Sequence, residues 1–313
     1  MTRARVGFSL VPLALALVVV LLAGCGSSVE DPESARCNAP EVTFGRKVVM
    51  GDHGEVDVHF RCVDTVLAGT LYLPKGTGPF PAVVYVHGSG EAPRWRWEVP
   101  WVGMTVGAGI AFFSYDKRGV GESEGECCPG DESHFNLLAA DADGAVNALR
   151  KRPDIDAASI GYLGTSQAGW VVPLALVRAP HRVAFTALAD AAAVTTHEEE
   201  QWSKLAGEET DNPPPLTKEK QAEITGQLKP SGFDPVPLLE QETVPGIWVF
   251  GGQDRSQPSQ RSAATLERLR ENGKDFTVVL FPDAGHGLLD TPPTDQRAMP
   301  TLLDWIEKQV RTT

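Results

Sequence analysis

The chain has 313 residues, with 28 lysines and arginines against 41 aspartates and glutamates, which gives a formal net charge of −13. Such an acidic chain excludes a nucleic-acid partner, because binding to phosphate groups requires clustered basic side chains. Without the first 24 residues, a length of about 289 residues suits one large α/β domain with insertions rather than two domains.

The N-terminal segment has the pattern of an export signal. Arg3 and Arg5 precede an apolar run from Val6 to Leu22, and residues 22–25 read Leu-Ala-Gly-Cys. This segment resembles a bacterial lipoprotein signal peptide, which implies cleavage before Cys25 and attachment of lipid to its thiol. The alternatives are an ordinary signal peptide and a membrane-spanning anchor, for which the apolar run is a little short.

We therefore expect a signal peptide at 1–24, a lipidated Cys25 with a flexible tether at 25–40, and a folded domain at 41–313. The predicted location is the extracytoplasmic face of a bacterial cell membrane, with the N-terminal lipid as the anchor. Removing residues 1–24 takes away two arginines and no acid, so 26 basic residues remain against 41 acidic ones, a charge of −15. This charge argues against electrostatic docking on anionic lipid.

Four further cysteines are Cys37, Cys62, Cys127 and Cys128. An exported protein can keep disulfides, and four cysteines allow three pairings, among which the sequence does not choose. A Cys37–Cys62 bond is attractive because both residues flank the N-terminal strand region, although it leaves the adjacent pair to form a strained ring. No second Cys-x-x-Cys or His-x-x-x-His accompanies these cysteines, so we expect no metal site.

The predicted elements begin with antiparallel strands in residues 41–74. From residue 80 onward, apolar strand-like runs alternate with helix-like segments, which predicts a mostly parallel, twisted sheet with helices on both faces. Residues 136–150 have helical spacing, and we expect Asp141 and Asp143 on a solvated or capping face. Residues 191–244 interrupt the alternation and form a candidate helical lid, in which Trp202 either lines a pocket or packs within the lid.

Residues 160–176 predict a strand that turns sharply into a helix with Ser166 at the turn, which is the pattern of a nucleophile elbow. Gly164 and Gly169 are the small residues that such a turn needs, whereas Ala168 stands where the usual pattern has glycine. Residues 121–125 match Gly-x-Ser-x-Gly better, but loop-like sequence follows and glutamates flank the serine. We therefore assign Ser123 to a surface turn.

An acid and a base follow in suitable surroundings. Asp254 comes just after an apolar strand-like run at 246–250, and His286 comes after another at 276–281. A serine hydroxyl is a poor nucleophile until an imidazole accepts its proton, and a carboxylate orients that imidazole. Asp190 and Asp283 are less favoured alternatives for the acid.

The oxyanion-binding groups are expected from two places. A strand-like run at 81–86 ends in His87-Gly88-Ser89-Gly90, and the turn after such a strand supplies one N–H, while the residue after the nucleophile supplies the other. We assign these donors to Ser89 and Gln167. We expect His87 to hold the loop.

From about Val66 to the C-terminus the chain resembles the α/β-hydrolase superfamily, in which serine, acid and histidine follow in this order. Residues 67–74, 87–90, 115–123 and 166–170 are similar to dienelactone-hydrolase-like and prolyl-oligopeptidase-like serine hydrolases.

This resemblance implies an α/β-hydrolase fold and cleavage of small-molecule carboxylic esters, with no metal or organic cofactor. It also implies that Asp116 and Arg118 stabilise a loop beside the site. The alternatives are a peptidase or amidase with the same triad, and a non-catalytic surface lipoprotein that keeps the fold for binding.

Overall fold

The computed structural model describes residues 1–2, 37, 41–179, 183–211 and 213–312. Residues 3–24 of the predicted signal peptide, Cys25 and most of the tether lie outside the described residues, so the signal peptide and its lipidation stay predictions. Among the described residues, no helix combines the length and the apolar character needed to cross a membrane.

Ten strands form one sheet, in the order β1-β3-β4-β6-β5-β7-β8-β9-β10, with β2 paired to β3. Pairing is antiparallel from β1 to β4 and between β4 and β6, and parallel from β6 through β5 to β10. The predicted antiparallel start and mostly parallel sheet are therefore confirmed. The strands are β1 (Val42–Phe44), β2 (Val48–Met50), β3 (His53–Cys62), β4 (Thr65–Pro74), β5 (Phe80–Val86), β6 (Ala111–Tyr115), β7 (Ile155–Thr165), β8 (Phe185–Ala189), β9 (Gly246–Gly251) and β10 (Phe276–Phe281).

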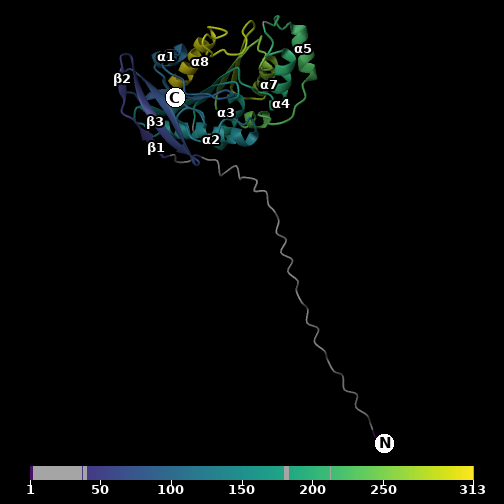
Figure 1. Cartoon of the computed structure of the whole chain (residues 1–313), viewed down its shortest axis with the longest axis horizontal. Helices are drawn as coiled ribbons and strands as arrows, with labels where there is room; N and C mark the ends of the chain where they lie inside the picture. The colour runs from purple at the N-terminus through teal and green to yellow at the C-terminus, as the bar shows by residue number, and fades with distance from the viewer. Residues whose placement is uncertain (3–36, 38–40, 180–182, 212, 313) are drawn as a thin grey trace. The chain divides into compact units, whose positions relative to one another are not determined.

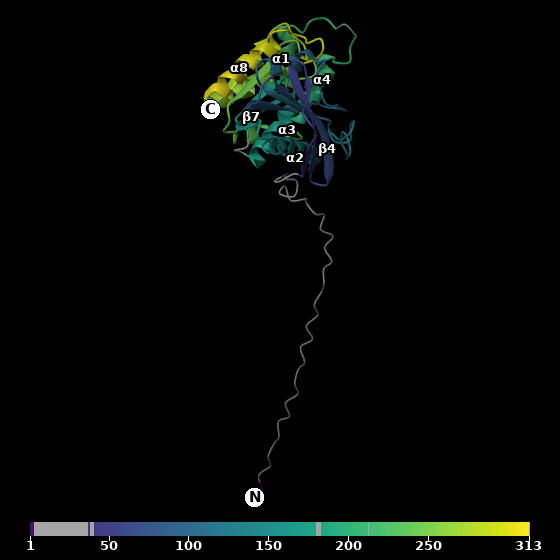
Figure 2. The same ribbon diagram turned by 90° about the vertical axis from the view of Figure 1, so that its left-hand side faces the viewer.

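Helices cover both faces of the sheet (Figures 1 and 2). Side chains on β5 alternate: Ala82 and Val84 join a core with α2, α3 and α7, while Val83 and Tyr85 join a second core with α1 and α8. Both faces of a parallel strand are therefore apolar, as burial on two sides requires. The helices are α1 (Pro100–Gly107), α2 (Glu132–Leu149), α3 (Ala168–Arg178), α4 (Thr196–Ala206), α5 (Lys218–Gln227), α6 (Val236–Leu239), α7 (Ser259–Glu271) and α8 (Ala298–Thr312).

Helix α2 differs from the sequence prediction in where it starts and in the burial of two aspartates. The helix starts at Glu132, before the predicted 136, because the Asp131 carboxylate accepts the His134 N–H and caps it. Asp141 is fully buried, not solvated, and its two oxygens accept from Nε and Nη2 of Arg118, each at 2.7 Å. Asp143 is also buried. The buried guanidinium requires a carboxylate partner, which places Asp141 against the loop that carries Arg118.

The predicted lid region, 191–244, contains α4, α5 and α6. Helices α4 and α5 share a small apolar core of their own, in which Trp202 is buried with Ile224 and Leu228, whereas Leu239 of α6 joins the main core. Trp202 Nε1 also donates to the backbone oxygen of Asp254 at 3.1 Å. Of the two expectations for Trp202, packing within the insertion is the one its surroundings support.

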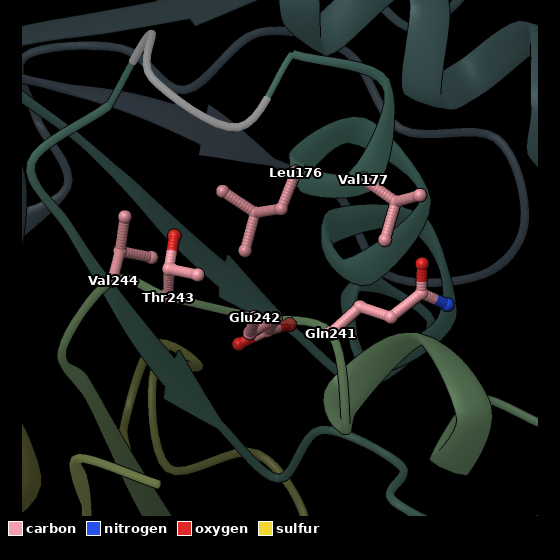
Figure 3. A pocket seen from close by; sticks show the side chains of 6 residues that line it. All are labelled: Leu176, Val177, Gln241, Glu242, Thr243 and Val244. Carbon is pink, nitrogen blue, oxygen red and sulfur yellow. The ribbon is translucent and has the colours of Figure 1, made fainter.

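A separate cavity of about 180 Å³ lies where the C-terminal end of α3 meets the segment that leads into β9 (Figure 3). Glu242 lines it, is 5% exposed, and has no hydrogen-bond partner for either carboxylate oxygen among the described residues. Burial raises the pKa of Glu242 to about 8. The folded protein therefore keeps a proton on Glu242 that the unfolded chain has lost above its ordinary pKa of 4.5.

This imbalance makes stability fall as pH rises from about 4.5 to about 8, by about 1.4 kcal/mol per pKa unit of difference. We expect Glu242→Gln, which cannot ionise, to remove that loss. Thermal unfolding across this pH range should show the variant gaining on the wild type as pH rises. A constant difference between the two proteins would contradict the assignment.

Candidate active site

Ser166 lies in a strained turn between β7 and α3. Its φ is +53°, a left-handed conformation that is rare for residues other than glycine. The backbone is held from both sides: the Ser166 N–H donates to Ala189 O at 3.1 Å, and the Ser166 carbonyl accepts from Gly169 and Ala192 at 3.0 and 3.3 Å. Such strain persists only where the surroundings fix it, and it is concentrated at functional sites.

Each small residue of the turn is required by a different steric contact. A Cβ atom on Gly169 would collide with the backbone N and O of Ala192. A Cβ atom on Gly164 would lie 2.6 Å from the Cβ of Ala168. The fully buried methyl group of Ala168 therefore fits because residue 164 has no side chain. This explains why alanine is tolerated where the usual pattern has glycine.

We expect Gly169→Ala to destabilise the fold by about 3 kcal/mol, because the added methyl group overpacks a site that touches backbone atoms. Urea denaturation measures the change. Ala168→Gly is the matched control, since it removes a methyl group one residue away and should cost only about 1 kcal/mol in helix propensity. Equal stability of the two variants would contradict this packing.

Asp254 and His286 form a hydrogen-bonded pair in the loops after β9 and β10. His286 Nδ1 lies 2.9 Å from Asp254 Oδ2. The buried Asp254 carboxylate also accepts the N–H groups of Ser256 and Gln257, each at 2.8 Å, and the Ser259 hydroxyl at 3.2 Å. With its oxygens so held, the carboxylate fixes the orientation of the imidazole.

The pKa of His286 reflects two opposing effects. Burial lowers it, but the hydrogen bond and charge of Asp254 outweigh burial and raise it to about 9. The pair therefore stabilises the imidazolium form that appears when the histidine takes a proton.

Asp190 lies close to this pair, and its hydrogen bonds hold the loop that carries His286 rather than the imidazole ring. It is 1% exposed, with Oδ2 accepting the N–H groups of Gly287 and Leu288 at 3.0 and 2.7 Å, and Oδ1 accepting Gly251 N–H at 3.3 Å. Burial and the charge of Asp254 raise the pKa of Asp190 to about 7.

Of the two alternative acids, Asp190 supports the histidine loop, and Asp283 is exposed. Ligand atoms of Asp190, Asp254 and His286 lie within 4.8 Å of one another, the one such set in the described part of the chain. The carboxylate oxygens of Asp190 and Asp254 already accept backbone and side-chain donors, so the three residues fit a His286–Asp254 pair with a supporting carboxylate better than a metal centre.

Ser166 and His286 line one cavity of about 330 Å³. The Gly88–Ser89 loop after β5 forms another wall of it, and a Cβ atom on Gly88 would lie 3.3 Å from the Ser166 Cβ. In the described residues, neither the Ser89 N–H nor the Gln167 N–H donates a hydrogen bond. Two unused donors thus flank the serine from the two segments where the sequence predicts them.

Ser123 corrects a prediction, whereas His87 agrees with one. Ser123, expected on a surface turn, is buried; its hydroxyl donates to Asp116 O at 2.6 Å and accepts the Ala68 N–H at 3.0 Å. The serine therefore ties its loop to β4, and it is not among the residues that line the cavity at Ser166. His87 is held by its own contact, Nε2 to Tyr115 O at 2.5 Å, in line with a structural role.

Lys117 is the residue that sequence reasoning missed. It is 2% exposed, and its Nζ donates to Gly88 O at 2.8 Å, Gly90 O at 3.1 Å and Gln167 Oε1 at 2.9 Å. The available signal was a lysine two residues beyond the buried strand β6, at the edge of the sheet where the other site loops begin.

The four cysteines among the described residues form two disulfides, Cys37 with Cys62 and Cys127 with Cys128. The first joins the end of β3 to the segment before β1, with a Cα–Cα distance of 5.3 Å.

A serine at a strand-to-helix turn, with acid and histidine in later loops of a mostly parallel sheet, defines an α/β-hydrolase. Residues 136–313, more than half of the chain, match the prolyl oligopeptidase family. The chain belongs to that family.

Similar proteins carry esterase and peptidase names. Esterase EstD of Thermotoga maritima is 28% identical over 247 residues, which is 70% of this chain and 57% of EstD, so the chain spans little more than half of that relative. Acetyl xylan esterase 1 of a Thermoanaerobacterium species has a TM-score of 0.59 at 20% identity, with 87% of this chain and 90% of that chain covered. The acylaminoacyl peptidase of Pyrococcus horikoshii has a TM-score of 0.61 at 16% identity, with 86% and 41% covered. These two structural likenesses support the fold.

Proposed function

We propose that this protein is a serine hydrolase that cleaves carboxylic esters through an acyl-enzyme. The observation that carries the proposal is the meeting of a strained Ser166 with the His286–Asp254 pair at one cavity. Ser166 Oγ attacks the ester carbonyl while His286 accepts its proton. Asp254 holds the ring and stabilises the resulting imidazolium.

The N–H groups of Ser89 and Gln167 bind the negative charge that develops on the carbonyl oxygen. His286 then gives its proton to the departing alcohol, and the ester C–O bond breaks. Water, activated by the same histidine, releases the acid from Ser166.

An apolar cavity of about 570 Å³ supports an ester with an apolar group. It lies between α1 and the loop after His286, and is lined by Trp101, Met104 and Met299 among others. Leu289 and Asp290 line both this cavity and the one at Ser166. A hydrophobic part of a substrate bound at Ser166 can therefore lie along this side, next to the histidine.

The name of the curated relative, an esterase, also favours ester over amide cleavage. Purified protein, assayed with p-nitrophenyl esters and with aminoacyl-nitroanilides, tests the choice. We expect ester turnover that is lost on denaturation and much weaker anilide turnover. Preferred anilide cleavage would establish the peptidase alternative, and no turnover of either series would favour a non-catalytic binding protein.

We also propose that a lipid on Cys25 anchors the enzyme to the extracytoplasmic face of a bacterial membrane. The support is the lipobox-like sequence at 22–25 and the acidic mature chain, which requires an anchor other than its own charge. Expressed in bacteria, the wild type should fractionate with membranes and incorporate labelled palmitate. Cys25→Ser should lose both properties; palmitate labelling that persists in the variant would refute the assignment.

A further inference from the structure

The strongest unexplained feature is a buried cation beneath the proposed oxyanion site. Lys117 uses all three of its ammonium hydrogens on neutral oxygens: the carbonyls of Gly88 and Gly90 and the side-chain oxygen of Gln167. Burial lowers the pKa of Lys117 to about 8. A buried ammonium that lacks a carboxylate partner is costly, so its retention calls for a reason beyond packing.

Neighbouring charges do not supply that partner. Asp116 accepts from the backbone N–H and the side chain of Arg94, and also from the Glu122 N–H. Asp141 is engaged by Arg118. The buried acids Asp116, which precedes Lys117, and Asp141, which pairs with the following Arg118, are thus occupied, and among the described residues no hydrogen bond joins Lys117 to a carboxylate.

The position of the three acceptors links Lys117 to both oxyanion donors. Gly88 C=O and Ser89 N–H belong to the same peptide unit, and in a trans peptide these two groups point in opposite directions. A bond from Lys117 to Gly88 O therefore fixes the direction of the Ser89 N–H. The same ammonium holds the side chain of Gln167, whose backbone N–H is the second donor.

The ammonium also acts electronically. Hydrogen bonding to a cation polarises the Gly88–Ser89 peptide and makes its N–H a stronger donor. A fixed positive charge near the site favours the state in which the carbonyl oxygen becomes negative. Both effects are larger in the transition state than in the substrate complex, so they are expected in kcat more than in KM.

We propose that Lys117 is a positioning residue that clamps the loop after β5 to Gln167, the N-cap residue of the nucleophile helix α3, and so presets the oxyanion hole. This inference rests on the proposed function, because it needs the Ser89 and Gln167 N–H groups to bind an oxyanion.

The test compares the wild type with Lys117→Met, which keeps an unbranched apolar chain one atom shorter than lysine and removes the charge and donors. We expect kcat for a p-nitrophenyl ester to fall about 100-fold with KM nearly unchanged, similar to loss of one oxyanion donor. A trifluoromethyl ketone, which forms an oxyanion on the serine, should lose affinity by a similar factor.

A second variant covers the case in which Lys117→Met does not fold. Gln167→Met keeps Lys117 and both N–H groups but removes one of the three acceptors. It should reduce kcat and ketone affinity together, by about 10-fold or less. Lys274→Met is the control: Lys274 Nζ also donates to a backbone carbonyl, that of Glu242 at 2.9 Å, but outside this cavity, and its loss should leave kcat unchanged.

The outcomes separate the two proposals. A wild type without ester turnover would remove the proposed function itself. If the wild type is active and Lys117→Met keeps kcat and ketone affinity within about three-fold of the wild-type values, the proposed clamp would be wrong. If Lys117→Met is unfolded, equal loss of ketone affinity and of affinity for a non-reactive ester analogue in Gln167→Met would assign Lys117 a purely structural role.

Discussion

Ser166→Ala should lower kcat for ester hydrolysis by at least about 10⁴-fold, the size of loss seen when a nucleophile of this type is removed. The alanine keeps the backbone contacts of the turn and loses the hydroxyl that attacks the carbonyl. Substrate binding should change little, since the oxyanion donors and cavity walls remain. Steady-state kinetics with p-nitrophenyl esters measure both quantities.

Ser123→Ala is the matched control for this change. Ser123 lies in the better literal Gly-x-Ser-x-Gly match, but its hydroxyl bonds to Asp116 O and Ala68 N. Its loss should lower stability by about 1–3 kcal/mol and leave kcat close to that of the wild type. A large loss of kcat in Ser123→Ala with retained activity in Ser166→Ala would reverse the assignment.

Asp254→Asn should reduce kcat by about 10⁴-fold, because an amide no longer holds His286 in the tautomer that accepts the serine proton. The acidic limb of the pH profile should also shift to lower pH. The rate rises as His286 loses its proton, and Asp254 raises the pKa of His286 in the wild type. Without the carboxylate that pKa falls.

Profiles of kcat/KM against pH for the two proteins test this second prediction. Asp283→Asn is the control, since Asp283 is an exposed acid three residues before His286. Asp283→Asn should keep the wild-type kcat and the wild-type acidic limb of the pH profile. An unchanged acidic limb in Asp254→Asn would show that another group sets the pKa of the base.

The fold was predictable because the hydrophobic pattern of each strand and helix lies within a short stretch of sequence. Apolar runs such as residues 81–86 and 246–250 are short and bounded by turn residues, and their alternation with helical segments implies a parallel sheet. The candidate site residues could be proposed from the sequence for the same reason. Each lies in the turn or loop that follows such a run, and the carboxyl ends of parallel strands meet at one edge of the sheet.

Partners distant in the sequence were not predictable. The spacing of α2 cannot reveal that Asp141 is buried, because its burial depends on Arg118, 23 residues earlier. Lys117 looks like an ordinary loop cation until folding brings Gly88 and Gln167 to it. The tolerance of Ala168 depends instead on a near neighbour in the sequence, because Gly164 on β7 leaves space for its methyl group only once the turn has formed.

The most direct test of the proposed mechanism locates the activated serine chemically. The folded protein is treated with a fluorophosphonate, digested, and mapped by mass spectrometry. We expect one phosphonyl group, on Ser166, and strongly reduced labelling in His286→Ala and after heat denaturation. Labelling of a different residue, or undiminished labelling of Ser166 in His286→Ala, would contradict the proposal that His286 activates this serine.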